Sequence, residues 1–168
     1  MSNFEKAENA YFEAINGINV KENEKIVLEC KTTWSYFFAK HISVADIKAH
    51  EKIILELKTP IVSYNFAVYI PGADIKAHEQ VIIEIKDLQY SYFFAKDIEG
   101  ADIKAHEQFI LDFKNLYYCY LFSKDIPGAN IEEHFKIILN SRDKYWFDKF
   151  IKYVNYKGTK VEEWLMYI

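Results

Sequence analysis

Apolar side chains recur along this chain at the spacing of an α-helix. One stripe is formed at i, i+3, i+7 and i+10 by Ile75, His78, Ile82 and Ile85. Val81 and Ile83 widen it, and polar residues cover the remaining positions. This pattern predicts an amphipathic helix that contacts neighbours on two sides. Asp74 directly precedes the stripe and is the predicted N-cap, because its carboxylate can accept amide protons of the first turn.

A second, shorter helix is predicted after a tight turn. It is dominated by aromatic residues, runs through Tyr90–Lys96 and has Asp87 as its predicted N-cap. Glu99–Gly100 ends it, since glycine readily adopts the left-handed conformation that terminates helices. The unit from Ala73 to Gly100 is therefore predicted as two helices and two turns, without room for a strand.

This unit recurs along the chain with a fixed period of 28 residues. Ala45–Glu51 is repeated letter for letter at Ala73–Glu79 and Ala101–Glu107, and a weaker copy starts at Ala129. The predicted N-caps recur with it at Asp46, Asp102, Asn130 and, in an earlier and less regular unit, Asn19. A fixed period of this length is typical of a solenoid, in which each unit contacts only its neighbours.

The repeats predict an all-α protein with a single domain over residues 1–168. We expect a right-handed α-solenoid of stacked antiparallel helix pairs, with about five units and about eleven or twelve helices. Half units are predicted at both ends, at Ala10–Gly17 and Thr159–Leu165. Divergent ends are expected because a terminal unit must cover the core instead of stacking on a neighbour.

The repeated sequence resembles a known kind of helical repeat. Its Ala-Asp-Ile-Lys-Ala-His-Glu segment, aromatic block and Pro-Gly pair are similar to short α-helical repeats of about 28 residues. Such repeats occur in uncharacterised proteins of AT-rich bacteria and their mobile elements, and look like compact relatives of HEAT-type solenoids. The resemblance covers the chain from about Ala10 onwards. It implies a solenoid without a shared catalytic motif, in which the histidine position is often aliphatic.

Composition narrows the classes of partner. Of the 168 residues, 51% are hydrophobic and 17% aromatic, and the formal net charge is -4. We therefore expect no general attraction to nucleic-acid backbones or anionic membranes. The single arginine, Arg142, cannot build several bidentate contacts to phosphate. Cys30 and Cys119 are predicted to be buried thiols, and a cytoplasmic protein is expected because no signal peptide or membrane span is visible.

Four histidines occupy equivalent positions of the repeat: His50, His78, His106 and His134. Stacked helices would align them in a column, with each ring on the apolar stripe of its helix. We predict that they pack at the edge of the core, with one ring nitrogen hydrogen-bonded. A pH-sensitive column and a metal site are the alternatives. No third ligand accompanies them consistently, so no metal or cofactor is predicted.

Charged residues recur on both kinds of helix. On the first helices, i, i+3 pairs are formed by Lys48/Glu51, Lys76/Glu79 and Lys104/Glu107. We predict that these pairs are solvated, with a charge-patterned binding face as the alternative. Near the ends of the second helices lie Lys40, Lys96, Lys124 and Lys152. These lysines are predicted to interact favourably with the partial negative charge at the helix C-termini. The alternative is that they hold single-stranded nucleic acid together with the aromatic residues nearby.

No motif predicts catalysis, and we expect a protein that is not an enzyme. Serines recur along the chain, but no base accompanies them in a repeated arrangement; these serines are Ser35, Ser63, Ser91 and Ser123. No catalytic or phosphate-binding motif is present. All five glycines fall at unit boundaries, which leaves none to shape an active-site loop.

The predicted function is non-catalytic binding of another protein or protein complex along an extended face. Stacked second helices would present rows of equivalent side chains, and aromatic residues are favoured at interfaces. The candidate partner-binding residues are Asn65, Tyr69, Phe93, Lys96, Leu121 and Asp148. Lys, Ile, Asn, Tyr and Phe are abundant, which is the residue bias of an AT-rich genome. Together with small size and near-identical repeats, this bias suggests a phage or mobile-element inhibitor that blocks a host defence complex.

Two other functions are alternatives. One is a nucleic-acid-binding helical repeat protein that uses the rows of lysines and aromatic residues. The other is a self-associating structural array, because identical units that stack once can stack again. In that case Trp164 and the apolar segment Leu165–Ile168 are either the contact or a cap.

Overall fold

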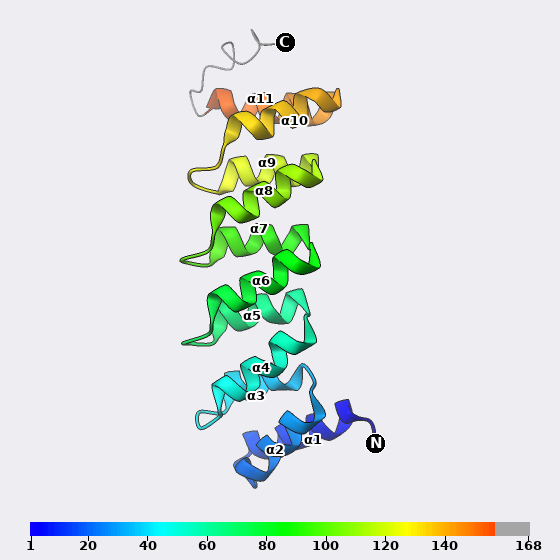
Figure 1. Cartoon of the computed structure of the whole chain (residues 1–168), viewed down its shortest axis with the longest axis vertical. Helices are drawn as coiled ribbons and strands as arrows, with labels where there is room; N and C mark the ends of the chain where they lie inside the picture. The colour runs from blue at the N-terminus through cyan, green and yellow to red at the C-terminus, as the bar shows by residue number, and fades with distance from the viewer. Residues whose placement is uncertain (157–168) are drawn as a thin grey trace. The chain divides into compact units, whose positions relative to one another are not determined.

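The computed structural model describes residues 1–156, which form eleven α-helices and no strand (Figure 1). The helices are α1 (Asn3–Ile15), α2 (Val20–Cys30), α3 (Trp34–His41), α4 (Ile47–Leu57), α5 (Pro60–Tyr69), α6 (Ile75–Ile85), α7 (Leu88–Asp97), α8 (Ile103–Phe113), α9 (Leu116–Asp125), α10 (Ile131–Ser141) and α11 (Lys144–Tyr156). The predicted first helices are α2, α4, α6, α8 and α10. The predicted second helices are α3, α5, α7, α9 and α11. The all-α prediction is confirmed for the described residues, whereas Thr159–Leu165, Trp164 and Leu165–Ile168 lie outside them.

The chain divides within α7 into two compact units. Among the described residues, unit 1 comprises 1–90 with 98–101, and unit 2 comprises 91–97 with 102–156. In unit 1, α1 packs on α2 and α3, α3 packs on α4, and α5 packs on α6. In unit 2, α9 packs on α8, α10 and α11. Within each unit, helices that are adjacent in sequence are thus also neighbours in space.

Polar side chains start the first helices as predicted. Each capping side chain accepts a hydrogen bond from the backbone N–H three residues further along the chain. The four caps are Asp46, Asp74, Asp102 and Asn130. Asp87 likewise accepts the N–H of Tyr90 at 3.0 Å at the start of α7. Asn19 differs, because it has left-handed backbone (φ 44°) and its side chain makes no capping hydrogen bond. At the N-terminal end, Ser2 and Glu5 form a reciprocal capping box, so α1 starts before the predicted half unit.

The core consists of side chains that recur with the 28-residue period. Fully buried phenylalanines come from the second helices, at Phe38, Phe66, Phe94 and Phe122. Fully buried isoleucines come from the first helices, at Ile54, Ile82, Ile110 and Ile138. In unit 1, small residues of α1 let it pack closely on Val27 and Phe38. Cys30 and Cys119 are buried free thiols, as predicted.

The first helices end in a way that the sequence pattern does not reveal. Each ends at a cationic residue in left-handed conformation, with φ between 47° and 62°: Lys31, Lys58, Lys86, Lys114 and Arg142. The predicted glycine terminators follow the second helices, and Gly72, for example, has φ 78°. A left-handed residue with a β-carbon is disfavoured by about 1–2 kcal/mol.

Replacing Lys114 with glycine is therefore expected to raise the free energy of unfolding by about 0.5–1 kcal/mol. Glycine removes the steric conflict at φ 53°, and its greater freedom in the unfolded chain offsets part of the gain. Urea unfolding measures the change. Lys114→Ala is the control, because it removes the same charge but keeps the β-carbon. Equal stability of the two variants would contradict the strain argument.

Candidate partner-binding surface

The four repeated histidines lie inside the protein, with no exposed surface: His50, His78, His106 and His134. Each ring packs on a phenylalanine of the preceding second helix, with centroids 5.0 to 5.6 Å apart. Burial lowers the pKa of His50 and His78, and lowers the pKa of His134 to about 4, because a charged ring would lose its hydration. Packing of the four rings in the core is confirmed. Among the described residues, the predicted hydrogen bond to one ring nitrogen is present in His106 and His134 but not in His50 and His78. In residues 1–156, no group of three potential ligands could hold a metal ion.

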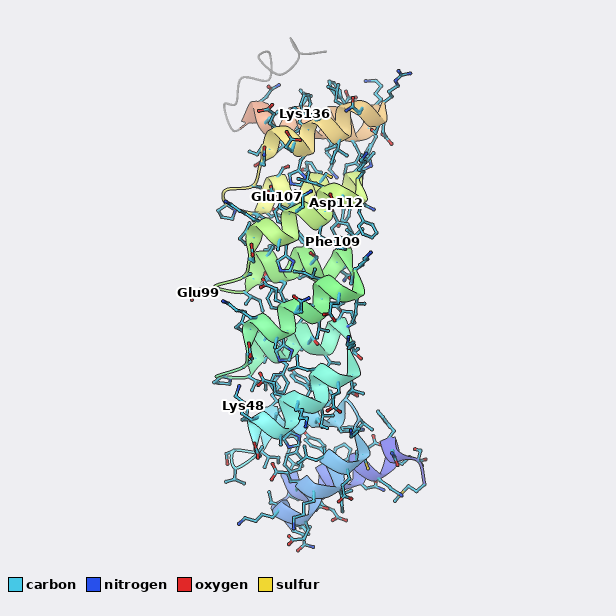
Figure 2. All side chains as sticks on the ribbon, in the orientation of Figure 1. Lys48, Glu99, Glu107, Phe109, Asp112 and Lys136 are labelled. Carbon is cyan, nitrogen blue, oxygen red and sulfur yellow. The ribbon has the colours of Figure 1, made fainter. Side chains whose placement is uncertain are left out.

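A glutamate of the preceding first helix faces three of these rings. The His78 Nε2 atom lies 3.5 Å from a Glu51 oxygen, and the same oxygen accepts the backbone N–H of Asp74 at 2.5 Å. Equivalent contacts join Glu24 to His50 and Asp46, and Glu107 (labelled in Figure 2) to His134 and Asn130. One carboxylate therefore connects its own helix to the N-terminus of the next first helix and to the buried ring there.

The prediction that the lysine–glutamate pairs are solvated is wrong for two of the three glutamates, and the third, Glu107, is half-buried. Glu51 is only 4% exposed and Glu79 only 8% exposed. Lys48, at the start of α4 in Figure 2, does bind Glu51 at 2.7 Å and is itself exposed. The Glu51 carboxylate accepts donors from its own helix and from the next repeat, and these hydrogen bonds offset its loss of hydration.

The hydroxyl group of one serine contacts the ring of one of the four histidines. Ser91 Oγ lies 2.8 Å from His106 Nδ1, which gives this one serine a paired base. Ser35 and Ser63 precede His50 and His78 by the same 15 positions, but their buried hydroxyls form no hydrogen bond within residues 1–156, so the spacing alone does not predict the pair. Ser91 and His106 are fully buried, so no substrate reaches this hydroxyl in the described fold. The pair acts as an internal hydrogen bond of the core.

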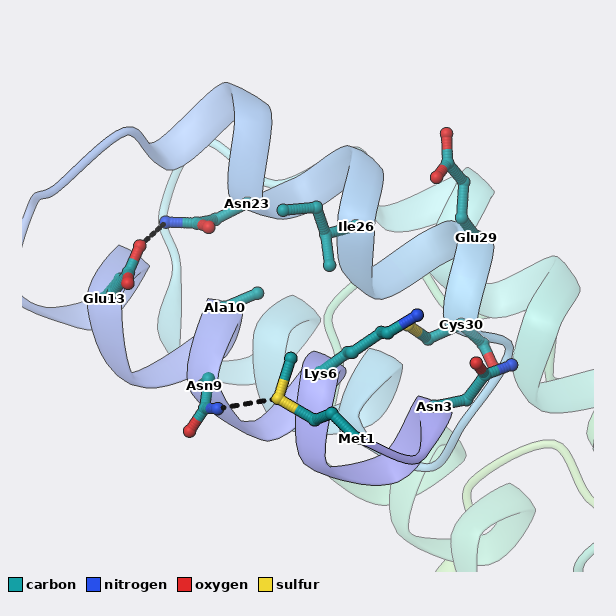
Figure 3. Close-up of a pocket in the computed structure, with 10 residues that line it drawn as sticks. All are labelled: Met1, Asn3, Lys6, Asn9, Ala10, Glu13, Asn23, Ile26, Glu29 and Cys30. Carbon is teal, nitrogen blue, oxygen red and sulfur yellow. Dashed lines mark hydrogen bonds between the residues drawn. The ribbon is translucent and has the colours of Figure 1, made fainter.

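A pocket opens between α1 and α2, as Figure 3 shows. Asn23 occupies the position that carries histidine in later repeats, and it is 4% exposed. Its side-chain amide donates to Glu13 at 3.1 Å and to the Ile18 carbonyl at 3.0 Å. In this first helix pair, Glu13 of α1 therefore faces the buried polar side chain. In later repeats, the glutamate that faces the equivalent histidine comes from the preceding first helix.

Aromatic side chains are exposed on α1 and α3 in unit 1. Phe4 is 50% exposed, Phe12 52% and Phe37 38%. All three contact Trp34, with ring centroids 5.2 to 5.8 Å apart. We call these four residues the α1–α3 patch.

A second aromatic surface lies on α9 and α11 in unit 2. Tyr117 and Tyr145 are 47% and 63% exposed and contact Trp146 at 5.8 and 5.1 Å. Tyr120 contacts the same tryptophan at 5.9 Å. The Lys149 ammonium lies 4.9 Å from the ring centres of Tyr120 and Trp146 and 5.4 Å from that of Tyr145. These five residues form the α9–α11 patch.

The six predicted partner-binding residues lie on second helices but differ in accessibility. Exposed are Tyr69, Lys96 and Asp148, and half-buried are Asn65, Phe93 and Leu121. The Tyr69 ring lies 4.1 Å from the Lys40 ammonium of α3. Lys96 is 3.8 Å from Asp125, and Asp148 binds Lys144 at 2.7 Å. Several of the predicted residues therefore interact within the chain.

The predicted lysine rows are partly engaged as well. Lys40, Lys96 and Lys124 lie in the last turns of their helices, where they oppose the helix dipole. Lys40 and Lys96 also donate to tyrosine hydroxyls of the same helix, at 3.0 and 3.2 Å. Lys152 lies inside α11 and is exposed.

The fold and surface define an all-α protein built from recurring pairs of helices. No family model, curated protein or solved structure matches this chain. None of the helices within residues 1–156 has the length and apolar composition that crossing a bilayer requires.

Proposed function

We propose that this protein binds another protein or protein complex, without catalysis, through exposed aromatic residues of its second helices. The observation that carries this proposal is the α9–α11 patch, in which two well-exposed tyrosines rest on a tryptophan. Tyrosine and tryptophan bury a large area on binding with little loss of rotamer entropy, and they are enriched at binding hot spots. Phe122 of α9 and Phe150 of α11 are fully buried and anchor the two helices in the core, which lowers the cost of ordering the surface.

We further propose that the helix pairs stack as one right-handed solenoid of about five units. The equivalent capping, core and glutamate–histidine contacts in successive repeats support this arrangement. The free thiols Cys30 and Cys119 support a reducing compartment such as the cytoplasm. Near-identical repeats and AT-rich composition support a more specific role, an inhibitor from a phage or mobile element that blocks a host defence complex.

Binding of a partner is expected to depend on the exposed tyrosines. The tagged protein should recover a stoichiometric partner from a lysate of its host, and Tyr117→Ala/Tyr145→Ala should reduce recovery by about tenfold, the loss of a hot-spot pair. The melting temperature should change little, because both side chains are exposed. Phe113→Ala is the matched control, since Phe113 is 49% exposed on the first helix α8. Absence of any partner, or equal losses in both variants, would contradict the proposal.

A nucleic-acid-binding function is the second candidate, favoured by one observation. A lysine held among aromatic rings, as Lys149 is, can contact a phosphate while neighbouring rings stack on bases. Such binding should weaken steeply as salt rises. Titration with a labelled oligouridylate at low salt tests it.

A further inference from the structure

We propose that the α9–α11 patch and the neighbouring Lys152 recognise an acidic segment of the partner protein, with Lys149 and Lys152 as the recognition residues. This inference rests on the proposed function and specifies its partner. The two lysines are three positions apart on α11, so they project from the same side of the helix. Together with Tyr120 and Tyr153 they line a hollow on the surface of unit 2. An ammonium pair beside half-buried tyrosine rings is suited to carboxylates that neighbour apolar side chains.

Two carboxylates of α9 and α11 are already engaged. Asp125 lies 3.6 Å from Lys124 and 3.8 Å from Lys96, and Asp148 binds Lys144 at 2.7 Å. In the part of the chain that the structure describes, Lys149 and Lys152 form no ion pair. The hollow therefore has positive charge that a partner can complement.

The Lys149 ammonium is positioned before any partner arrives. Its contacts with three rings restrict the side chain, and it donates to the Tyr145 hydroxyl at 3.4 Å. The ammonium retains further N–H donors. Since part of the side-chain entropy is lost on folding, less is lost when a carboxylate binds. Tyr153 is also restrained, because its hydroxyl donates to the Ser123 carbonyl at 2.8 Å.

The arrangement of the rings favours a protein over a nucleic acid. The Tyr117 and Tyr145 rings meet Trp146 at 66° and 82°, so the rings pack edge to face. Base stacking needs accessible ring faces, and Trp146 is partly covered by its neighbours and by Lys149. The net charge of -4 also opposes general binding to phosphate backbones. Tilted tyrosine rings can instead cover aliphatic and aromatic side chains of a peptide.

Fluorescence anisotropy with a labelled random copolymer of glutamate and tyrosine tests this proposal. At an ionic strength of about 10 mM, where exposed charges are weakly screened, wild-type protein should bind the copolymer. Lys149→Glu/Lys152→Glu should bind it at least about tenfold more weakly, because like charges then face each other. The control Lys21→Glu/Lys25→Glu changes the net charge equally on α2 in unit 1 and should leave the affinity within about twofold.

Three outcomes would overturn the proposal: no binding of the copolymer by wild-type protein, equal weakening in both variants, or binding of oligouridylate in place of the copolymer. Circular dichroism of both variants confirms that each remains folded. The pull-down separates this proposal from the proposed function. If a partner is lost with Tyr117→Ala/Tyr145→Ala but retained with Lys149→Glu/Lys152→Glu, protein binding stands and the acidic segment does not. If wild-type protein recovers no partner, the proposed function itself fails.

Discussion

Replacing Glu51 with alanine is expected to lower the free energy of unfolding by about 2–4 kcal/mol, the range for leaving buried donors without an acceptor. The variant removes the acceptor of the Asp74 N–H and the carboxylate that faces His78 Nε2. Water cannot replace it readily, because Glu51 is 4% exposed and His78 is fully buried. The loss affects the junction between successive repeats, where one side chain joins α4 to the start of α6.

Two further variants identify the cause of the effect. Glu51→Gln keeps an acceptor for the Asp74 N–H, so we expect a smaller loss, about half as large. Glu56→Ala removes a glutamate of the same helix whose side chain is 44% exposed and pairs with Lys31 at 3.0 Å. An exposed pair contributes less than about 1 kcal/mol. Urea unfolding at neutral pH measures all three. If Glu51→Ala costs no more than Glu56→Ala, the carboxylate is not a junction contact.

Acidification from pH 6.5 towards pH 4 is expected to destabilise the fold strongly. Burial lowers the folded-state pKa of His50, His78 and His134 below the ordinary value of 6.5, and that of His134 falls to about 4. Between these values the unfolded chain binds protons that the folded chain excludes. Stability is therefore fully present above pH 6.5 and is lost as the pH falls towards 4. For His134 alone the difference corresponds to about 3 kcal/mol.

The groups around these rings oppose the shift without reversing it. Glu24 faces His50 and Glu51 faces His78, and both carboxylates favour the charged ring. Burial is the larger effect in each case. The free energy of unfolding, measured in urea at successive pH values, should fall through this window. His134→Leu should reduce the slope, because it removes one of the groups whose pKa burial lowers. Undiminished stability at pH 4.5 would show that the rings accept protons without unfolding.

The predicted partner-binding residues differ widely in exposure, and their role in binding stays a prediction. Tyr117 and Tyr145 are exposed beside the half-buried Lys149, and none of the three is among the predicted residues. The 28-residue separation of Tyr117 from Tyr145 was visible in the sequence. Their exposure was not, because it depends on which side of α9 and α11 the neighbouring helices cover.

Periodicity and local chemistry alone determine much of this protein. The apolar period, the capping residues and the glycine terminators predict helices and their order, because these interactions act within a few residues of the chain. Because equivalent positions of each repeat make equivalent contacts, the phenylalanine and isoleucine positions of the core can be predicted as well.

Only the tertiary structure decides which charged and polar side chains are buried and which partners they contact. Glu51 reads as an exposed helix residue, yet it is buried because Asp74 and His78, from the next repeat, supply its partners. Ser91 and His106 meet across two helices, and Lys114 adopts left-handed backbone without any local signal. Each of these outcomes depends on donors, acceptors and packing supplied from distant positions. Hydrophobic periodicity reports which face of a helix is buried, but not which polar groups find partners there.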